Sequence, residues 1–191
     1  MYLENRRAID IANWFLAQQK VEEGDSITNL KLQKLVYYSQ AWSMVFRDKP
    51  LFADEIQAWD YGPVIPSLYK RYKKYKFDNI LSHKSKFDFP DFSDDETNVL
   101  NFVFKNYGEM SGQHLSKLTH EEDPWKIARA GWDSIDRPCK NTIVNESMKA
   151  FYDNVLAENE DKFEFNLSHF ENQEYDEADA VKDLFIEHQI L

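Results

Sequence analysis

The sequence predicts a mainly α-helical protein that folds as one compact domain, with at most a short β element near residues 55–60. Three observations carry this prediction. Apolar residues recur at the i, i+3, i+4, i+7 spacing of a helix along most of the chain. The alternation that marks strands is rare, and only 5 of the 191 residues are glycine. The length suits one domain with a real core, and 15% aromatic residues supply apolar surface to fill it.

Two helices are predicted in the first quarter of the chain. The first has an apolar face with one helical period, made of Ala8, Ile11, Ala12 and Phe15. The second, over residues 28–45, begins at Thr28, whose hydroxyl can accept a free amide of the first turn. Apolar residues cover most of the circumference of this second helix. Such a helix usually lies at the centre of a core.

The segment "EIQAWDYGPVIPSLY", residues 55–69, sets two prolines between aromatic residues. Its first half alternates weakly, and Gly62–Pro63 is a turn signal. Pro66 suits the first position of a helix, because its missing amide has no helical partner there. A helix that began at Pro63 would instead lose its first backbone hydrogen bond at Pro66. We therefore predict a short strand, a tight turn and a helix that starts near Pro66.

Helical spacing predicts four more helices. They cover residues 96–110, the segment "DPWKIAR", residues 145–157 and the C-terminal end of the chain. In "DPWKIAR", Asp123 is expected to cap the helix and Pro124 to occupy its first position. The last helix has an apolar face made of Val181, Leu184, Phe185 and His188.

The negative charge is concentrated at the C-terminus. The chain has a net charge of −11, and residues 158–191 hold eleven acidic and two basic residues, a net of −9. Residues 1–157 therefore carry −2. We expect a domain over residues 1–157, followed by an acidic extension over residues 158–191 that ends in a helix. This charge disfavours general binding to nucleic-acid phosphates or to anionic membranes.

Cysteine usage and hydropathy predict a soluble cytoplasmic protein. Cys139 is the only cysteine, so neither an internal disulfide nor a cysteine-based zinc site can form. The N-terminal residues show no continuous apolar run of the kind found in secretory signals. No apolar stretch approaches the roughly 20 residues of a membrane span.

The sequence shows no catalytic or metal-binding motif. A nucleophile elbow, a Walker loop and a glycine-rich phosphate loop are all missing. His114 and His120 are six residues apart, which does not place them on one helical face, and "HEED" lacks the second histidine of a zinc protease. We therefore predict no enzymatic activity, no cofactor and no metal site.

The segment "YKRYKKYK", residues 69–76, interleaves tyrosines with five basic residues. One interpretation is the solvated face of an amphipathic helix. A second is a contact surface for an acidic partner or for the acidic extension of the same chain. A third, a nucleic-acid strip, is disfavoured by the overall charge. The aromatic residues Trp59, Tyr61, Tyr69 and Trp125 are more typical of a core than of an interface, although interfaces also use tyrosine and tryptophan as anchors.

Three segments together carry a resemblance to a known family. In order they are "ITNLKLQKLVYYSQAW" (27–42), "PLFADEIQAWDYGPVIPSLY" (50–69) and "LSKLTHEEDPWKIAR" (115–129). They resemble the Panacea domain, the SocA-like or GepA-type family, and "ESMKAFY" (146–152) is similar to its closing helix. The resemblance covers about residues 5–156. It implies a mostly helical antitoxin, often found in mobile elements and prophages, with no established catalytic residues.

From this resemblance we predict an antitoxin that neutralises a cognate protein toxin by direct contact. The alternative is an adaptor that delivers a partner protein to a protease, and an unrecognised enzyme is a third class. The acidic extension is expected either to help recognise the partner or to fold back on the protein's own surface. The residues predicted to contact the partner are Trp59, Tyr61, Tyr69, Lys70, Lys73, Lys74, Leu184 and Phe185.

Overall fold

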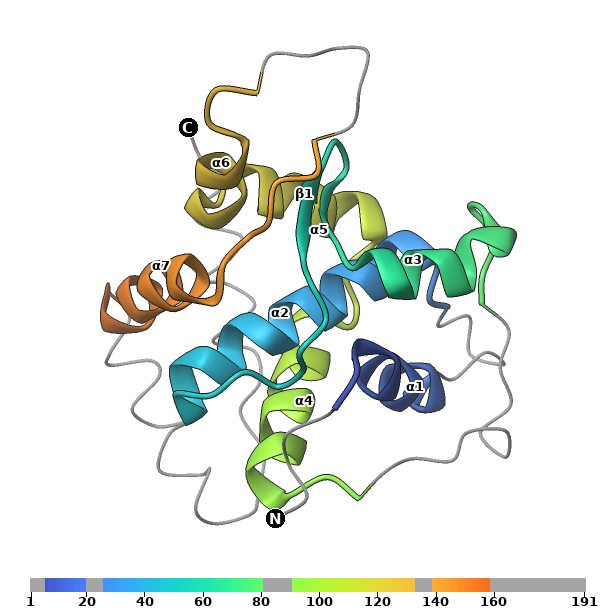
Figure 1. Cartoon of the computed structure of the whole chain (residues 1–191). Helices are drawn as coiled ribbons and strands as arrows, with labels where there is room; N and C mark the ends of the chain where they lie inside the picture. The colour runs from blue at the N-terminus through green and yellow to red at the C-terminus, as the bar shows by residue number, and fades with distance from the viewer. Residues whose placement is uncertain (1–5, 20–25, 81–90, 133–138, 159–191) are drawn as a thin grey trace.

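The computed structural model describes residues 6–19, 26–80, 91–132 and 139–158 (Figure 1). Within these ranges helices dominate, and the β structure consists of one two-stranded antiparallel sheet and two isolated bridges. This confirms the prediction of a mainly α-helical domain. The elements are α1 (Ala8–Gln18), α2 (Asn29–Arg47), β1 (Gln57–Trp59), β2 (Gly62–Val64), α3 (Pro66–Tyr72), the 3₁₀ helix η2 (Lys73–Tyr75), α4 (Asp94–Tyr107), α5 (Gly112–Glu121), α6 (Asp123–Arg129) and α7 (Asn145–Glu158).

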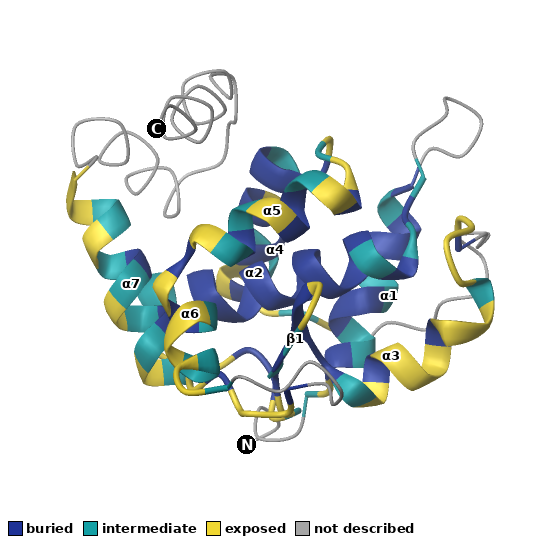
Figure 2. Ribbon diagram, turned by 90° about the horizontal axis from the view of Figure 1, so that it is seen from above, coloured by how far each residue is buried: buried dark blue, intermediate teal, exposed yellow. Residues whose placement is uncertain are grey.

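Helix α2 crosses the middle of the molecule, and the other elements pack around it (Figure 1). Every residue from Lys31 to Met44 is buried, and in Figure 2 the helix is dark blue along most of its length. The predicted cap is present, since Thr28 Oγ1 accepts the amide of Lys31 at 3.2 Å. The prediction of a central helix, made from its all-round apolar surface, is therefore confirmed.

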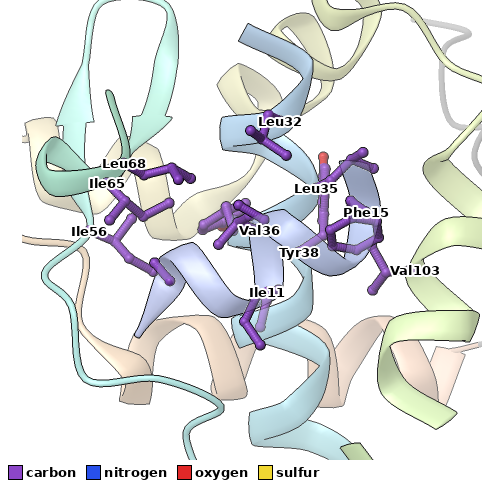
Figure 3. Close-up of a cluster of buried hydrophobic side chains, with 14 of the residues drawn as sticks. Ile11, Phe15, Leu32, Leu35, Val36, Tyr38, Ile56, Ile65, Leu68 and Val103 are labelled. Carbon is purple, nitrogen blue, oxygen red and sulfur yellow. The ribbon is translucent and has the colours of Figure 1, made fainter. Parts of the chain in front are cut away.

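The core contains an apolar part and an aromatic part. Figure 3 shows the apolar part, where Ile11 and Phe15 of α1 lie among side chains of α2 and Val103 of α4. In the aromatic part, the rings of Tyr38 and Tyr107 stack with centroids 4.0 Å apart. Trp42 Nε1 donates to Tyr107 Oη at 3.0 Å, so a buried indole and a buried phenol satisfy each other.

Two buried glutamines of α2 hold irregular chain against the helix. Gln40 Oε1 accepts the amides of Leu51 and Phe52 at 2.8 and 3.1 Å. Gln33 Oε1 accepts the amide of Ile65 at 2.8 Å. Buried backbone amides need hydrogen-bond acceptors. Here the glutamine side chains supply the acceptors that neighbouring strands would supply in a larger sheet. The segment between α2 and α3 therefore stays ordered although it contains little regular structure.

The β element is a small two-stranded hairpin, which agrees with the prediction of at most a short β element near residues 55–60. The position of its turn was predicted wrongly, because Gly62 and Pro63 lie in the second strand and the turn falls at residues 60–61. Pro63 pairs with Ala58, and the amide of Ala58 donates instead to Asn141 O at 2.9 Å. Ala58 and Pro63 thus form a pair without ladder hydrogen bonds, where a missing proline amide costs nothing.

The predicted helix starts are partly confirmed. Helix α3 begins at Pro66, as expected. Helix α6 begins one residue before the prediction, because Glu122 is its N-cap residue and Asp123 is its first helical residue. The prediction that Asp123 caps α6 is therefore wrong. Helix α4 begins at Asp94, where Ser93 and Glu96 form a capping box. The predicted helix at residues 181–188, and the acidic extension after Glu158, lie outside the described residues.

Candidate functional site

Two aromatic residues of the β-hairpin, Trp59 and Tyr61, and one of α3, Tyr69, form what we call the hairpin face. Tyr61 is 74% exposed and Tyr69 is 37% exposed, while Trp59 is half-buried. The rings of Trp59 and Tyr69 meet edge to face with centroids 5.0 Å apart. Trp125 of α6 is also half-buried. The interpretation as core residues is wrong for Trp59, Tyr61 and Tyr69, whereas Trp125 packs against the edge of the core.

A chain of polar side chains fixes the orientation of Trp59. Trp59 Nε1 donates to Gln57 Oε1 at 2.8 Å, and Gln57 Nε2 donates to Glu55 Oε2 at 3.0 Å. The other oxygen of Glu55 accepts the hydroxyl of Thr142. Because these partners lie along β1 and the neighbouring segment, the indole is held in one orientation before any partner binds.

Helix α6 holds the hairpin through two side chains one helical turn apart. Trp125 Nε1 donates to Trp59 O at 3.0 Å, and Arg129 Nη1 donates to Ala58 O at 2.9 Å. Arg129 Nη2 also forms an ion pair with Asp60 at 3.0 Å, and its guanidinium lies over the Trp125 ring at 5.0 Å. The end of β1 and the start of the hairpin turn, residues 58–60, are therefore bonded to α6.

Helices α2 and α5 support the hairpin from inside. Lys34 Nζ donates to Pro63 O at 2.9 Å, and Ser116 Oγ donates to Tyr61 O at 2.9 Å. Gly62 has a φ of +90°, and a Cβ built there would lie 2.5 Å from Thr119 Oγ1 and 2.8 Å from Lys34 Nζ. Both the backbone conformation and the close approach of these side chains require glycine at this position.

Beneath the hairpin lies a buried carboxylate that sequence analysis missed. Glu122, the residue between α5 and α6, turns its side chain into the core. Tyr38 of α2 donates to its Oε1 at 2.9 Å, and Tyr152 of α7 donates to its Oε2 at 2.8 Å. The hydroxyl of Tyr37 is buried nearby and has no hydrogen-bond partner in the described structure. The sequence does contain a signal, since Lys34 and the adjacent tyrosines Tyr37 and Tyr38 lie on a helix predicted to be central, where such polar groups need a buried partner.

Burial dominates the electrostatics of this cluster. It raises the pKa of Glu122 to about 7, although the hydroxyls of Tyr152 and Tyr38 stabilise the charged form. Burial also lowers the pKa of Lys34 to about 7, and the Glu122 carboxylate opposes that change. The same burial raises the tyrosine pKa values well above their usual range, so the phenols stay protonated donors. The arrangement therefore anchors α6 to α2 and α7 through a carboxylate at the helix junction.

The basic residues of "YKRYKKYK" lie on α3, on η2 and at the residue after it, and all five are exposed. We call Lys70, Arg71, Lys73, Lys74 and Lys76 the basic strip. Tyr72, on the opposite side, is buried and donates to Asn13 Oδ1 at 3.2 Å. The segment therefore has one basic, exposed side and one buried side, as an amphipathic helix has. Leu184 and Phe185, the other predicted contact residues, lie outside the described residues.

The two histidines considered as ligands lie on α5. The ring of His120 packs against Trp125 with centroids 4.3 Å apart, and burial lowers the pKa of His120. Among the described residues, no three histidine, cysteine or acidic side chains converge as a metal site would require. In the same part of the chain, no helix combines the length and the apolar character needed to span a bilayer.

The family described as Antitoxin SocA-like, Panacea domain, matches residues 32–126 of the chain. The chain is similar to this family over these 95 of its 191 residues. The Antitoxin SocA of Caulobacter vibrioides (strain NA1000 / CB15N) is 28% identical over 115 residues, which cover 55% of this chain and 61% of that protein. The chain thus aligns with about three fifths of this curated relative. No solved structure matches the chain.

The three segments that resemble the Panacea family meet at the site. Lys34 and Tyr38 come from the first segment, Pro63 from the second, and Glu122 and Trp125 from the third. The contacts among them join α2, the hairpin and α6. The Panacea match also includes the hairpin face and the buried glutamate, although Arg129 lies just beyond it. The shared part of the chain is therefore the part that builds this surface.

We expect Gly62→Ala to destabilise the fold by about 2–4 kcal/mol. The change combines an unfavourable left-handed backbone with a Cβ inside the contact distance of Thr119 and Lys34. Gly131→Ala is the matched control, because Gly131 also has a positive φ, +77°, but nothing lies within 4 Å of its added Cβ. That variant should lose only about 1 kcal/mol. Urea unfolding followed by circular dichroism measures both, and equal losses would contradict the proposed close packing.

We expect Glu122→Gln to change how stability depends on pH. The folded pKa of about 7 lies above the usual 4.5, so between these values the folded state keeps a proton that the unfolded state has released. The stability contribution of Glu122 is complete below pH 4.5 and is lost as pH rises through 7. The wild type should therefore lose stability relative to Glu122→Gln between pH 5 and pH 8, by about 1–3 kcal/mol.

Chemical denaturation at several pH values measures this difference. Glu121→Gln is the control, because that neighbouring carboxylate is 75% exposed. Its effect should be nearly independent of pH over the same range. A constant difference between the wild type and Glu122→Gln from pH 5 to pH 8 would rule out a raised pKa for Glu122.

Proposed function

We propose that this protein is an antitoxin that neutralises a cognate protein toxin by binding it directly through the hairpin face. The observation that carries the proposal is an exposed aromatic surface held in a fixed conformation. Trp59 and Tyr69 contact each other at the surface, and Tyr61, at the hairpin turn two residues after Trp59, is 74% exposed. Similarity to the SocA-like Panacea family over residues 32–126 supports the antitoxin role, as does the name of the relative from Caulobacter vibrioides.

Fixed aromatic side chains are effective anchors for a protein partner. Tyrosine and tryptophan bury a large area at low entropic cost, and they are enriched among the residues that dominate interface energies. The polar chain from Thr142 to Trp59 removes much of the remaining freedom before binding. A surface that is already ordered loses less conformational entropy on association, so more of the contact energy contributes to affinity.

The proposed mechanism needs no chemistry from this chain. The most perturbed carboxylate, Glu122, is 9% exposed and both its oxygens accept tyrosine hydroxyls. A general acid or base must reach the proton that it transfers, whereas this group is occupied by structural contacts. Its position supports a role in shaping the binding surface from inside.

We expect the double change Tyr61→Ala with Tyr69→Ala to weaken toxin binding by about 10–100-fold, which is the loss of one or two interface anchors. The toxin used is the product of the gene next to this one, and isothermal titration with the purified proteins measures the affinity. Phe77→Ala is the control, since Phe77 is 93% exposed but lies outside the hairpin face. It should bind like the wild type.

A growth assay tests the function itself. Co-expression of the wild type should relieve the toxicity of the neighbouring gene product, and the double variant should relieve it less. Purified components without a protease should still show neutralisation, which distinguishes direct binding from delivery to a protease. Failure of the wild type to bind or neutralise the neighbouring product would overturn the proposal.

A further inference from the structure

The basic strip is a positively charged surface whose charges are not paired with carboxylates of the described structure. Its five cations lie within seven consecutive residues, and no acidic residue occurs from Pro66 to Phe77. All five are exposed, and none forms an ion pair with a carboxylate of the described structure. Like charges this close repel one another, so a strip of this kind favours a bound anion.

Asp78, two positions after Lys76, forms no ion pair with the strip in the described structure and could balance at most one of its five cations, and three carboxylates near the hairpin are engaged elsewhere. Asp54 accepts the hydroxyl of Ser67 and the amide of Ala8, and Asp60 pairs with Arg129. Glu55 accepts from Gln57 and Thr142. Three acidic side chains near the hairpin thus hold the fold together and leave the strip uncompensated.

Aromatic surface accompanies the cations. Phe77, directly after the strip, is 93% exposed, and Tyr69, directly before it, is 37% exposed. The ring of Tyr75 is partly covered by Lys74, whose Nζ lies 5.1 Å from its centroid. An occupant that combines acidic and aromatic residues would therefore match both features of this surface better than a simple anion.

We propose that the basic strip is the docking site of the acidic C-terminal extension of the same chain, chiefly residues 163–181. This segment contains six acidic residues and no basic one. Its aromatic residues are interleaved with the acidic ones, and they are Phe163, Phe165, Phe170 and Tyr175. Its composition thus complements the strip in charge and in apolar character, and no other segment of the chain is as acidic over a similar length.

The extension is long enough to reach the strip. It follows Glu158 at the end of α7, and its acidic cluster begins at Glu171, 13 positions further along the chain. An extended chain of that length spans roughly 43 Å, whereas a domain of this size has a radius of gyration of about 15 Å. Tethering also gives the extension an effective concentration in the millimolar range, which a separate polyanion would have to exceed.

This assignment goes beyond the proposed antitoxin function and does not depend on it. The basic strip then binds the protein's own extension. This acidic segment competes with nucleic acid for the strip and excludes it. Tyr69 belongs both to α3 and to the hairpin face, so the docked extension would lie directly beside the proposed toxin contact.

A spin label in the full-length protein tests the docking. Cys139 is the only cysteine and is buried, so Ser168→Cys introduces the one accessible thiol for a nitroxide. In a ¹⁵N-labelled chain the nitroxide should broaden the amide signals of residues 69–77, and 0.5 M salt should reduce the broadening several-fold. Broadening elsewhere without broadening of residues 69–77 would overturn the proposal.

Charge reversal supplies the matched comparison. Lys70→Glu, Lys73→Glu and Lys74→Glu together should abolish the broadening at residues 69–77. The control triple, Lys49→Glu, Lys117→Glu and Lys140→Glu, removes the same charge from other exposed positions and should preserve it. Equal loss in both triples would show a general charge effect and would overturn specific docking.

Two further measurements complete the test. Reversing Glu171, Glu174 and Glu177 to lysine in the strip triple should restore the broadening, because the two charge patterns are exchanged. A mixture is then made of two chains, one that carries the nitroxide without ¹⁵N and one that carries ¹⁵N without the nitroxide. In this mixture the amide signals of residues 69–77 should not broaden. Broadening in that mixture would mean that the extension of a second copy occupies the strip, which contradicts docking within one chain.

Discussion

The buried carboxylate of Glu122 is the interaction on which the rest of the structure depends. An ionisable group in a core costs several kcal/mol unless its oxygens are satisfied, and here Tyr38 and Tyr152 satisfy them from two different helices. The α5–α6 junction must therefore face both α2 and α7. Once the junction is fixed, Trp125 and Arg129 on α6 are placed where their side chains reach the hairpin backbone.

The hairpin in turn depends on this support. A two-stranded ribbon of three-residue strands has little stability of its own in water. Here side chains from α2, α5 and α6 bond to its carbonyls, and the neighbouring segment supplies backbone hydrogen bonds through Asn141 and Ile143. The support comes from behind and from the sides, so the outer surface with Trp59 and Tyr69 is ordered and still accessible.

Local chemistry allowed the described helices other than α5 (Gly112–Glu121) to be predicted, whereas the site depended on distant partners. Thr28 and Pro66 mark helix starts through interactions with their own next turn, which a sequence displays directly. Glu122 looks like its acidic neighbours, and its burial is decided by tyrosines 84 and 30 residues away. Whether Trp59 faces the core or solvent likewise depends on a hairpin whose second strand is held by Lys34. Sequence periodicity carries no information about such contacts.

The surface thus combines two adjacent regions with different physics. The hairpin face is aromatic, and the charge within its turn is paired, since Asp60 binds Arg129. Binding there would depend mainly on shape and burial, which salt affects little. The basic strip acts through unpaired charge, which salt screens over about 10 Å at 0.1 M. The chain carries most of its negative charge after residue 157, so an acidic segment tethered to the domain can neutralise the strip. The aromatic surface beside the strip would still recognise its partner mainly through burial, which depends little on salt.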